Sequence, residues 1–460
     1  MHTWAPSGVC GFLLFGPAGL LRVASTQVAV SSASEARGMV PAVKFHWFAE
    51  VTYDGLPAEF PAPGQGAWMD TPIDLADSRR VGENYRMFIR LMQQADRAGF
   101  DGLAVNEHHQ TPFAMTPSPN LLAASVASST ENAAILVIGD SLALYNPPTR
   151  VAEELAYLDC LSEGRLIAGF VFGTPMDSTF AYGTTPIELR ERFHEARELV
   201  LRGWREREPF AFNGKYTQLR YVNLWPRPIQ ERPPIWVPGS NSVETWDLVT
   251  RENYCYGHLS FSGLRAAKPL VDQYWDYVAA HDGDMNPHRM AFTQLVCVAD
   301  TDREAEEKYY EAVKYFQRVK DPSMAFATPP GYTSAASMAS TLKRVNTAQA
   351  MEDKRRATRG EMSFWEYDEK GYIIAGTPDR VAQRLRELTT ELRVGQLIAS
   401  LHMGNLPEET AAENTHLFGT QVIPALRDLW ADEPDHWTPP VSRARIAARE
   451  AAALTPVAGS

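Results

Sequence analysis

Cysteine is scarce in this chain of 460 residues, with four of them at positions 10, 160, 255 and 297. No two form a C-x-x-C pair, so the sequence encodes neither a local zinc site nor a redox dithiol. Cysteines that lie far apart are typical of free thiols in a reducing compartment. We therefore expect a cytoplasmic protein.

Basic charge and long hydrophobic runs are also lacking. The 44 Lys and Arg residues are outnumbered by 56 Asp and Glu residues, and the formal net charge is -12. Without a basic stripe, nucleic acid is not an expected partner. The apolar stretch 9–23 is too short to span a bilayer, and no other stretch is a membrane candidate.

The first 38 residues carry no convincing structural signal, and we expect a disordered leader. A secretory signal peptide is one alternative, but it requires positive charge before its apolar run, and only His2 stands there. A start codon assigned too early is the other alternative. Met39 sits just before the first convincing strand and is the candidate true start.

Strand-like and helix-like segments alternate from about residue 43 to residue 430. The simplest architecture is a closed (β/α)8 barrel of the TIM type over residues 39–430. The segment 321–368 breaks the rhythm after the seventh strand and is expected to be an insertion that orders only over a bound ligand. Residues 431–460 are expected to be a loose C-terminal tail. The eight predicted strands lie at 43–48, 101–109, 134–139, 165–173, 234–239, 254–260, 291–298 and 394–401.

A doubly wound open sheet is the alternative architecture. It would require a G-x-G-x-x-G turn after the first strand, and none follows residues 43–48.

The second predicted strand runs through small and apolar residues into Asn106, Glu107, His108 and His109. In a barrel of parallel strands, such strand ends form the active site. Neighbouring residues on an extended backbone point to opposite faces, so we expect one imidazole to serve the site and the other to pack. Because Glu107 can orient an imidazole, a general acid or base is favoured over a core histidine. A zinc site would need further ligands close by, and none are spaced for it.

A second signal follows the fifth predicted strand, where Gly239, Ser240 and Ser242 precede a helix. Free backbone N–H groups and the helix dipole at this position favour a phosphate. An ordinary helix cap by Ser240 or Ser242 is the alternative. The other strand ends are polar, aromatic or glycine-bearing, without acids at metal spacing. This rim suits a planar organic cofactor better than a metal.

Several motifs resemble those of the bacterial luciferase-like flavin-dependent monooxygenases, in the same order along the chain. The resemblance covers about residues 42–430. The motifs are G-F-D-G at 99–102, E-H-H at 107–109, R at 150 with E-E at 153–154, L-S-E-G-R at 161–165, P-P-I-W-V-P-G-S at 233–240, A-G-T-P at 375–378 and V-I-P-A-L at 422–426.

The resemblance implies a TIM-like barrel that binds reduced FMN, supplied by a separate NAD(P)H-flavin reductase. Oxygen would add to the flavin to give a C4a-peroxide that oxygenates a small organic substrate. The resemblance also implies that His108, with Glu107, serves this intermediate. The family often pairs barrels through helices near the second and third strands, so a homodimer is expected. The cofactor-binding residues implied or suggested by position are Asn106, Asp140, Ser141, Phe172, Gly239, Ser240 and Ser242.

The chain departs from the light-emitting members at the end of the fourth strand. Those members carry a reactive cysteine followed by a phosphate-binding arginine, where this chain has Val171 and Phe172. We expect Arg220 or Arg227 to replace that arginine. The departures argue against light emission and a long-chain aldehyde substrate.

Aromatic residues at candidate cavity positions, Trp47, Trp68 and Phe172, favour a small apolar substrate. Two alternatives stay open on the same fold. One is a deazaflavin-dependent oxidoreductase that transfers hydride without oxygen. The other is a flavin-binding barrel protein without catalytic activity.

Overall fold

The computed structural model describes residues 42–61, 66–259, 261, 263–321, 324–344 and 347–454. Eight parallel strands hydrogen-bond in the order β9-β11-β1-β2-β3-β4-β7-β8, and β8 pairs with β9 to close the ring. The predicted (β/α)8 barrel is therefore confirmed, and the open doubly wound sheet is excluded. The strands of the ring are β1 (Lys44–Phe48), β2 (Gly102–Val105), β3 (Ala134–Ser141), β4 (Leu166–Val171), β7 (Ile235–Gly239), β8 (Cys255–His258), β9 (Met290–Val298) and β11 (Gln396–Ser400).

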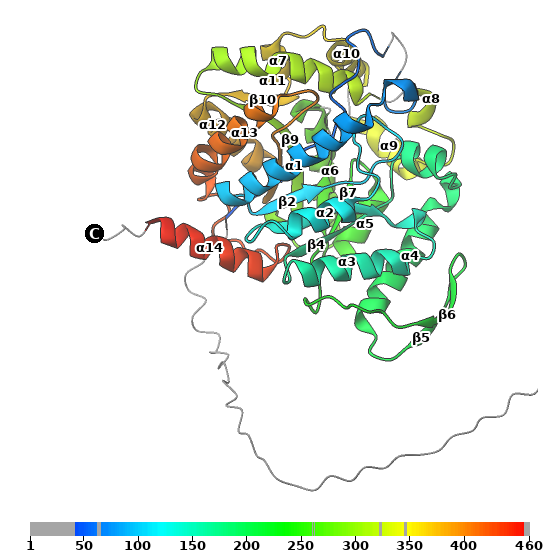
Figure 1. Cartoon of the computed structure of the whole chain (residues 1–460). Coiled ribbons are helices and arrows are strands. Elements are labelled where there is room, and N and C mark those ends of the chain that lie inside the picture. Colours follow the sequence, from blue (N-terminus) through cyan, green and yellow to red (C-terminus); the bar gives the residue numbers. More distant parts are fainter. Residues whose placement is uncertain are drawn as a thin grey trace, which may run out of the picture. The chain divides into compact units, whose positions relative to one another are not determined.

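Helices surround the strands, as Figure 1 shows. Each helix of the outer layer buries one apolar face against the sheet, which is the pattern that the sequence periodicity predicted. The helices of this layer are α1 (Ser78–Ala98), α2 (Pro119–Ala127), α3 (Thr149–Leu161), α4 (Leu189–Arg205), α5 (Val243–Glu252), α6 (Leu264–Ala280), α7 (Asp302–Val319), α12 (Pro378–Glu391) and α13 (Glu408–Leu417). An antiparallel hairpin, β5 (Phe210–Asn213) and β6 (Gln218–Val222), lies between α4 and β7 in the chain.

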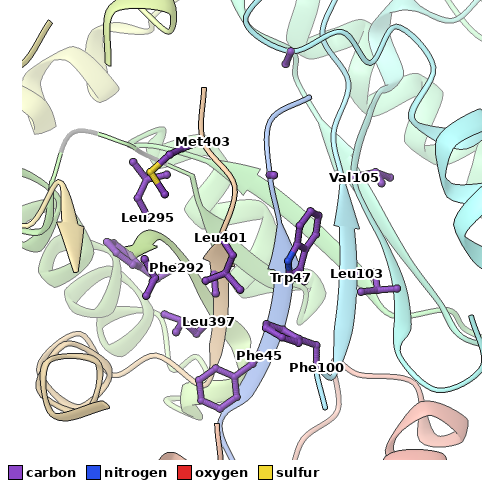
Figure 2. Close-up of a cluster of buried hydrophobic side chains, with 14 of the residues drawn as sticks. Phe45, Trp47, Phe100, Leu103, Val105, Phe292, Leu295, Leu397, Leu401 and Met403 are labelled. Carbon is purple, nitrogen blue, oxygen red and sulfur yellow. The ribbon is translucent and has the colours of Figure 1, made fainter. Parts of the chain in front are cut away.

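Trp47 belongs to the hydrophobic core rather than to the wall of a ligand cavity. Figure 2 shows it among the buried side chains of the core, beside Phe45 and Leu103. Its side chain is fully buried, and its Nε1 donates to Thr415 Oγ1 of α13 at 3.0 Å. Successive side chains of a barrel strand alternate between the interior and the helix layer. The expectation that Trp47 lines the cavity was wrong because Trp47 faces the helices.

The insertion after the seventh barrel strand is helical rather than irregular. It contains α8 (Met324–Ala327), α9 (Ala335–Arg344), α10 (Thr347–Thr358) and α11 (Phe364–Glu369). Ala, Met, Lys and Arg favour helix locally, while the break at Pro329, Pro330 and Gly331 hides any long helical period in the sequence. A ninth parallel strand, β10 (Ile373–Gly376), pairs with the C-terminal half of β9 outside the ring.

The described part of the C-terminal segment, residues 431–454, is folded against the barrel, so the expectation of a loose tail was wrong for these residues. Trp437 is buried, its carbonyl accepts from Trp236 Nε1 at 3.0 Å, and its own Nε1 donates to Asn253 O at 3.0 Å. The helix α14 (Pro440–Leu454; red in Figure 1) follows. Scattered Pro, Ala and Arg residues in this segment show no apolar period from which its packing could be predicted. The leader at 1–38 lies outside the described residues, and the division of the chain at 38 and 430 stays a prediction.

No helix in the described ranges is long and apolar enough to cross a membrane.

Candidate active site

A cavity of about 550 Å³ opens among the residues that follow the C-terminal ends of the barrel strands. Its size falls within the range of small-molecule and cofactor sites, roughly 300–1,000 Å³. Most of its wall is apolar or aromatic, with a few polar groups placed at strand ends. Of the residues predicted for the site, those that line it are Asn106, Glu107, His108, Ser141, Phe172, Gly239, Ser240 and Ser242.

His108 lies in the cavity wall, three residues beyond the end of β2. Its Nδ1 is 2.8 Å from Asp177 Oδ2, and its ring meets the edge of Trp68 at a centroid distance of 4.8 Å. Asp177 belongs to a turn of π-helix, Met176–Ala181, that follows β4. The sequence analysis missed Asp177, because 69 residues separate it from His108 and no motif links the two.

His109 lies behind the wall and is not part of the cavity lining. Its Nε2 is 2.7 Å from Glu107 Oε1, and its ring packs on Tyr182 at 4.5 Å. The second carboxylate oxygen of Glu107 accepts from the backbone N–H of Ser141 at 2.7 Å. Glu107 therefore orients His109 and the end of β3. Asp177, and not Glu107, orients His108.

The surroundings of the His108–Asp177 pair favour its charged form. Burial lowers the pKa of His108, but Asp177, Glu50 and Glu107 together outweigh burial and raise it above its usual value. In turn, burial would raise the pKa of Asp177, but His108 and the backbone N–H of His109 lower it below its usual range. With Nδ1 engaged by Asp177, the imidazolium keeps its Nε2–H to donate elsewhere.

Glu50 is a second cavity residue to which the sequence analysis gave no role. Asn106 Nδ2 donates to Glu50 Oε2 at 2.6 Å, and Asn106 Oδ1 accepts from Thr116 Oγ1 at 3.3 Å. Burial raises the pKa of Glu50 to about 6, although His108 and Asn106 oppose the shift. Asn106 thus acts on Glu50, while its predicted contact to a cofactor stays a prediction.

Asp140 does not reach the cavity, in contrast to its neighbour Ser141. It is fully buried, and its Oδ1 accepts from Asn120 Nδ2 at 2.9 Å and from Tyr145 OH at 3.4 Å. Burial and the nearby Glu107 raise its pKa well above its usual value. The register of β3 shifts between Val137 and Asp140, and beyond Ile138 it is Ser141, not Asp140, that lines the cavity. The expectation that Asp140 lies at the cofactor cavity was therefore wrong.

The floor beside Ser141 admits only glycine at position 139. A Cβ on Gly139 would stand 2.3 Å from the carbonyl oxygen of Gly169 in the adjacent strand. The two backbones approach closely there, and position 139 contributes no side chain to the cavity wall. A wall without a side chain at this position has room for a planar ring.

The turn after β7 combines a helix cap with a cluster of polar groups. Ser242 caps α5, accepting from Thr245 N at 3.4 Å, and its Oγ donates to Glu244 Oε2 at 2.9 Å. Arg190 of α4 donates to the same Oγ at 3.2 Å, and lies 3.5 Å from Glu244. The guanidinium also stands over the Phe172 ring at 5.2 Å.

Arg190 lies at the turn after β7, whereas the sequence suggested Arg220 or Arg227 as the arginine of this site. Neither of these two residues lines the cavity, and Arg227 donates to Trp204 O at 3.4 Å instead. Arg190 lies within a helix rich in Glu and Arg, so its sequence context resembles that of a solvated helix face.

Residues 62–394 match the family described as "Luciferase-like monooxygenase". The chain belongs to that family. The resemblance drawn from the motifs is thereby confirmed, and with it a flavin-type cofactor and monooxygenase chemistry as properties of the family.

Two relatives and one solved structure are similar to parts or most of this chain. It is 30% identical over 169 residues to the oxygenase component of the flavin-dependent trigonelline monooxygenase of Acinetobacter baylyi, covering 35% of this chain and 45% of that protein. It is 34% identical over 161 residues to the F420-dependent glucose-6-phosphate dehydrogenase of Kineococcus radiotolerans, covering 33% and 46%. The fold is similar to the oxygenating constituent of 3,6-diketocamphane monooxygenase from Pseudomonas putida, solved with FMN, with a TM-score of 0.61, 20% identity and coverage of 83% and 98%.

The residues present in this luciferase-like monooxygenase fit a phosphate-bearing planar cofactor. The glycine floor accommodates a ring, and the polar turn at Ser240 and Ser242 lies at the same cavity as Arg190. Two buried polar atoms of the lining, Trp68 Nε1 and Thr293 Oγ1, lack hydrogen-bond partners among the described residues. Such groups are normally satisfied, so a ligand is the expected partner.

Proposed function

We propose that this protein is a monooxygenase that uses reduced FMN and O2 to oxygenate a small organic substrate. The observation that carries the proposal is the His108–Asp177 pair, which shares one cavity with the polar turn after β7. When bound, reduced FMN supplies the electrons that activate dioxygen.

The chain's own residues would bind and orient the cofactor and would exclude water from the cavity. Ser240, Ser242, Arg190 and the N–H groups at the start of α5 would hold the phosphate. Phe172, with the glycine floor at the end of β3, would form the slot for the ring. The apolar wall keeps water out, and this strengthens every charge inside the cavity.

His108 would act on the reacting oxygen atoms as a charged hydrogen-bond donor. Asp177 holds the Nδ1 proton, so the Nε2 proton is the one available to the cavity. Glu107 would act indirectly by fixing His109 and the end of β3.

A separate NAD(P)H-flavin reductase would supply the reduced flavin. The support comes from relatives whose names describe an oxygenase component and an oxygenating constituent. A homodimer and a cytoplasmic location stay predictions from sequence.

A deazaflavin-dependent oxidoreductase is the second candidate function. Its support is the similarity to an F420-dependent dehydrogenase over a third of the chain. A flavin-binding protein without activity is the third candidate, and the intact His108–Asp177 pair argues against it.

Anaerobic titration with reduced FMN and with the reduced deazaflavin coenzyme separates the first two candidates. We expect dissociation constants for reduced FMN in the micromolar range or below and weaker binding of the deazaflavin. On mixing with O2 in a stopped-flow instrument, the bound flavin should reoxidise with a time course distinct from that of free reduced FMN. The proposal is wrong if reduced FMN does not bind at micromolar levels.

The variant His108→Ala distinguishes the enzyme hypothesis from that of a flavin-binding protein without activity. It should bind reduced FMN normally and lose turnover in the presence of a reductase, NADH and O2. Unchanged turnover would remove His108 from the mechanism.

A further inference from the structure

Besides His108, three cationic side chains of the described chain line the cavity, and they differ in their partners. Arg190 lies 3.5 Å from Glu244, and Lys354 lies 2.6 Å from Asp321. Lys320, at the C-terminal cap of α7, donates to the carbonyl oxygen of Phe261 at 3.0 Å. No carboxylate of the described chain forms an ion pair with it. Lys320 is therefore a cation of the cavity wall that forms no ion pair with a described carboxylate, because the neighbouring Asp321 pairs with Lys354.

An ammonium group withdrawn from water needs a counter-charge or pays a large desolvation penalty. Burial and the neighbouring Lys354 together lower the pKa of Lys320 to about 7, and Asp321 opposes them. A bound anion would remove this penalty and stabilise the charged lysine. The cavity therefore favours a negatively charged group beside Lys320.

An aromatic strip connects this lysine to the candidate catalytic histidine. The ring of Phe261, whose carbonyl binds Lys320, meets Phe316 at 5.1 Å. Phe316 meets Phe113 at 5.8 Å, and Phe113 meets His108 at 5.8 Å. Phe316 is fully buried behind the wall, so an apolar molecular body would lie along the lining rings of Phe261 and Phe113 toward His108.

The other charges of the cavity decide which way a charged substrate would lie. Glu50 and Asp177 flank His108, so an anionic group would be repelled at that end. Arg190 is engaged by Glu244 and Ser242 at the turn assigned to the cofactor phosphate. Lys320 is the remaining position for a substrate anion.

We propose that Lys320 binds the carboxylate of an organic-acid substrate whose apolar body lies along Phe261 and Phe113 toward His108. The inference rests on the proposed function, because it places the substrate in the cavity where oxygenation would occur. It narrows the substrate to an amphipathic acid.

Matched pairs of acids and amides test the proposal. Isothermal titration of the protein, with and without FMN, would compare 3-phenylpropanoate with 3-phenylpropanamide and octanoate with octanamide. At least one acid should bind about tenfold more tightly than its amide, the range expected for a charged hydrogen bond. In Lys320→Met the preference should fall below about twofold, while Lys320→Arg should keep part of it.

Lys308→Met is the matched control, because Lys308 lies on the same helix, pairs with Glu413 and is outside the cavity lining. It should keep the acid preference and the FMN affinity of the wild type. Thermal melts would show that each variant is folded.

Three results would overturn the inference: no binding of any acid at millimolar concentration, equal binding of acid and amide, or a Lys320→Met variant that loses FMN affinity and keeps the acid preference. Failure of the proposed function is recognised separately. In that case the wild-type protein would not bind reduced FMN, whatever the acid titrations without FMN show.

Discussion

The imidazole of His108 is bonded to the carboxylate of Asp177, with 2.8 Å between Nδ1 and Oδ2. The carboxylate is itself fixed, since Thr174 Oγ1 donates to Oδ2 at 2.8 Å and His109 N donates to Oδ1 at 2.8 Å. The turn after β4 therefore sets the orientation and charge of a residue that follows β2. Asp177 is a positioning residue for His108.

Asp177→Asn should reduce turnover by about 100-fold, within the range of general acid–base effects, and leave FMN binding intact. Loss of the carboxylate should lower the pKa of His108, which is raised in the wild type. A raised pKa stabilises the fold below the unfolded value of the histidine, and this stabilisation is lost as pH rises through the folded value. Because turnover would require the charged imidazole, the alkaline limb of the rate profile should move to lower pH in the variant.

NMR titration of His108 in both proteins provides the direct measurement. An unchanged pKa in Asp177→Asn would show that the carboxylate does not control the charge of the imidazole. Thr174→Val, which removes one bond to the carboxylate but no charge, is the control and should shift the pKa far less.

Glu50→Gln should alter the dependence of stability on pH. Burial raises the pKa of Glu50 to about 6, from a reference value near 4.5. Wild-type stability from this group is present below the reference value and is lost as pH rises through the folded value. From about pH 4 to about pH 8, the variant should gain about 2 kcal/mol relative to the wild type. Urea unfolding of both proteins at the two pH values measures this gain, and a constant difference would contradict the prediction.

Arg190→Met should weaken FMN binding about tenfold and leave riboflavin binding unchanged, because only FMN carries the phosphate. Flavin fluorescence titrations with both ligands measure the effect. Arg227→Met is the control, since Arg227 does not line the cavity and should affect neither ligand. Equal weakening of FMN and riboflavin would place Arg190 at the ring rather than at the phosphate.

Trp437→Ala should destabilise the fold by about 3–5 kcal/mol, the usual range for removal of a buried tryptophan. Trp437 is 2% exposed and hydrogen-bonds Asn253 of the barrel. Trp225→Ala is the control, because Trp225 is 81% exposed and its loss should change stability by less than about 0.5 kcal/mol. Urea unfolding compares the stability of the two variants. If both substitutions have similarly small effects, the C-terminal segment does not stabilise the barrel and behaves as a loose tail.

Several features could be read from sequence because their signals are local. Apolar runs followed by helical periods predicted the barrel, the polar end of the second strand indicated the histidine pair, and the family resemblance chose His108 of the two. The turn at Ser240 and Ser242 was found for the same reason: a strand, a small polar turn and a helix follow one another directly in the chain.

The misassignments share a physical cause, which is that side-chain direction and distant contacts leave no local signal. Asp140 and Ser141 are adjacent, yet only the serine faces the cavity, because the register of β3 decides the alternation. Trp437 follows polar and proline-rich sequence, and its burial depends on a site formed by Trp236 and Asn253.

By itself, the sequence determined the eightfold alternation, the family and the two strand ends that carry the site. Only the tertiary structure decided that Asp177 rather than Glu107 holds His108, that Arg190 reaches the turn after β7, and that Lys320 faces the cavity without a carboxylate. Closure of the barrel brings loops from separate strands to one cavity, and the charge of each group there depends on which others it meets.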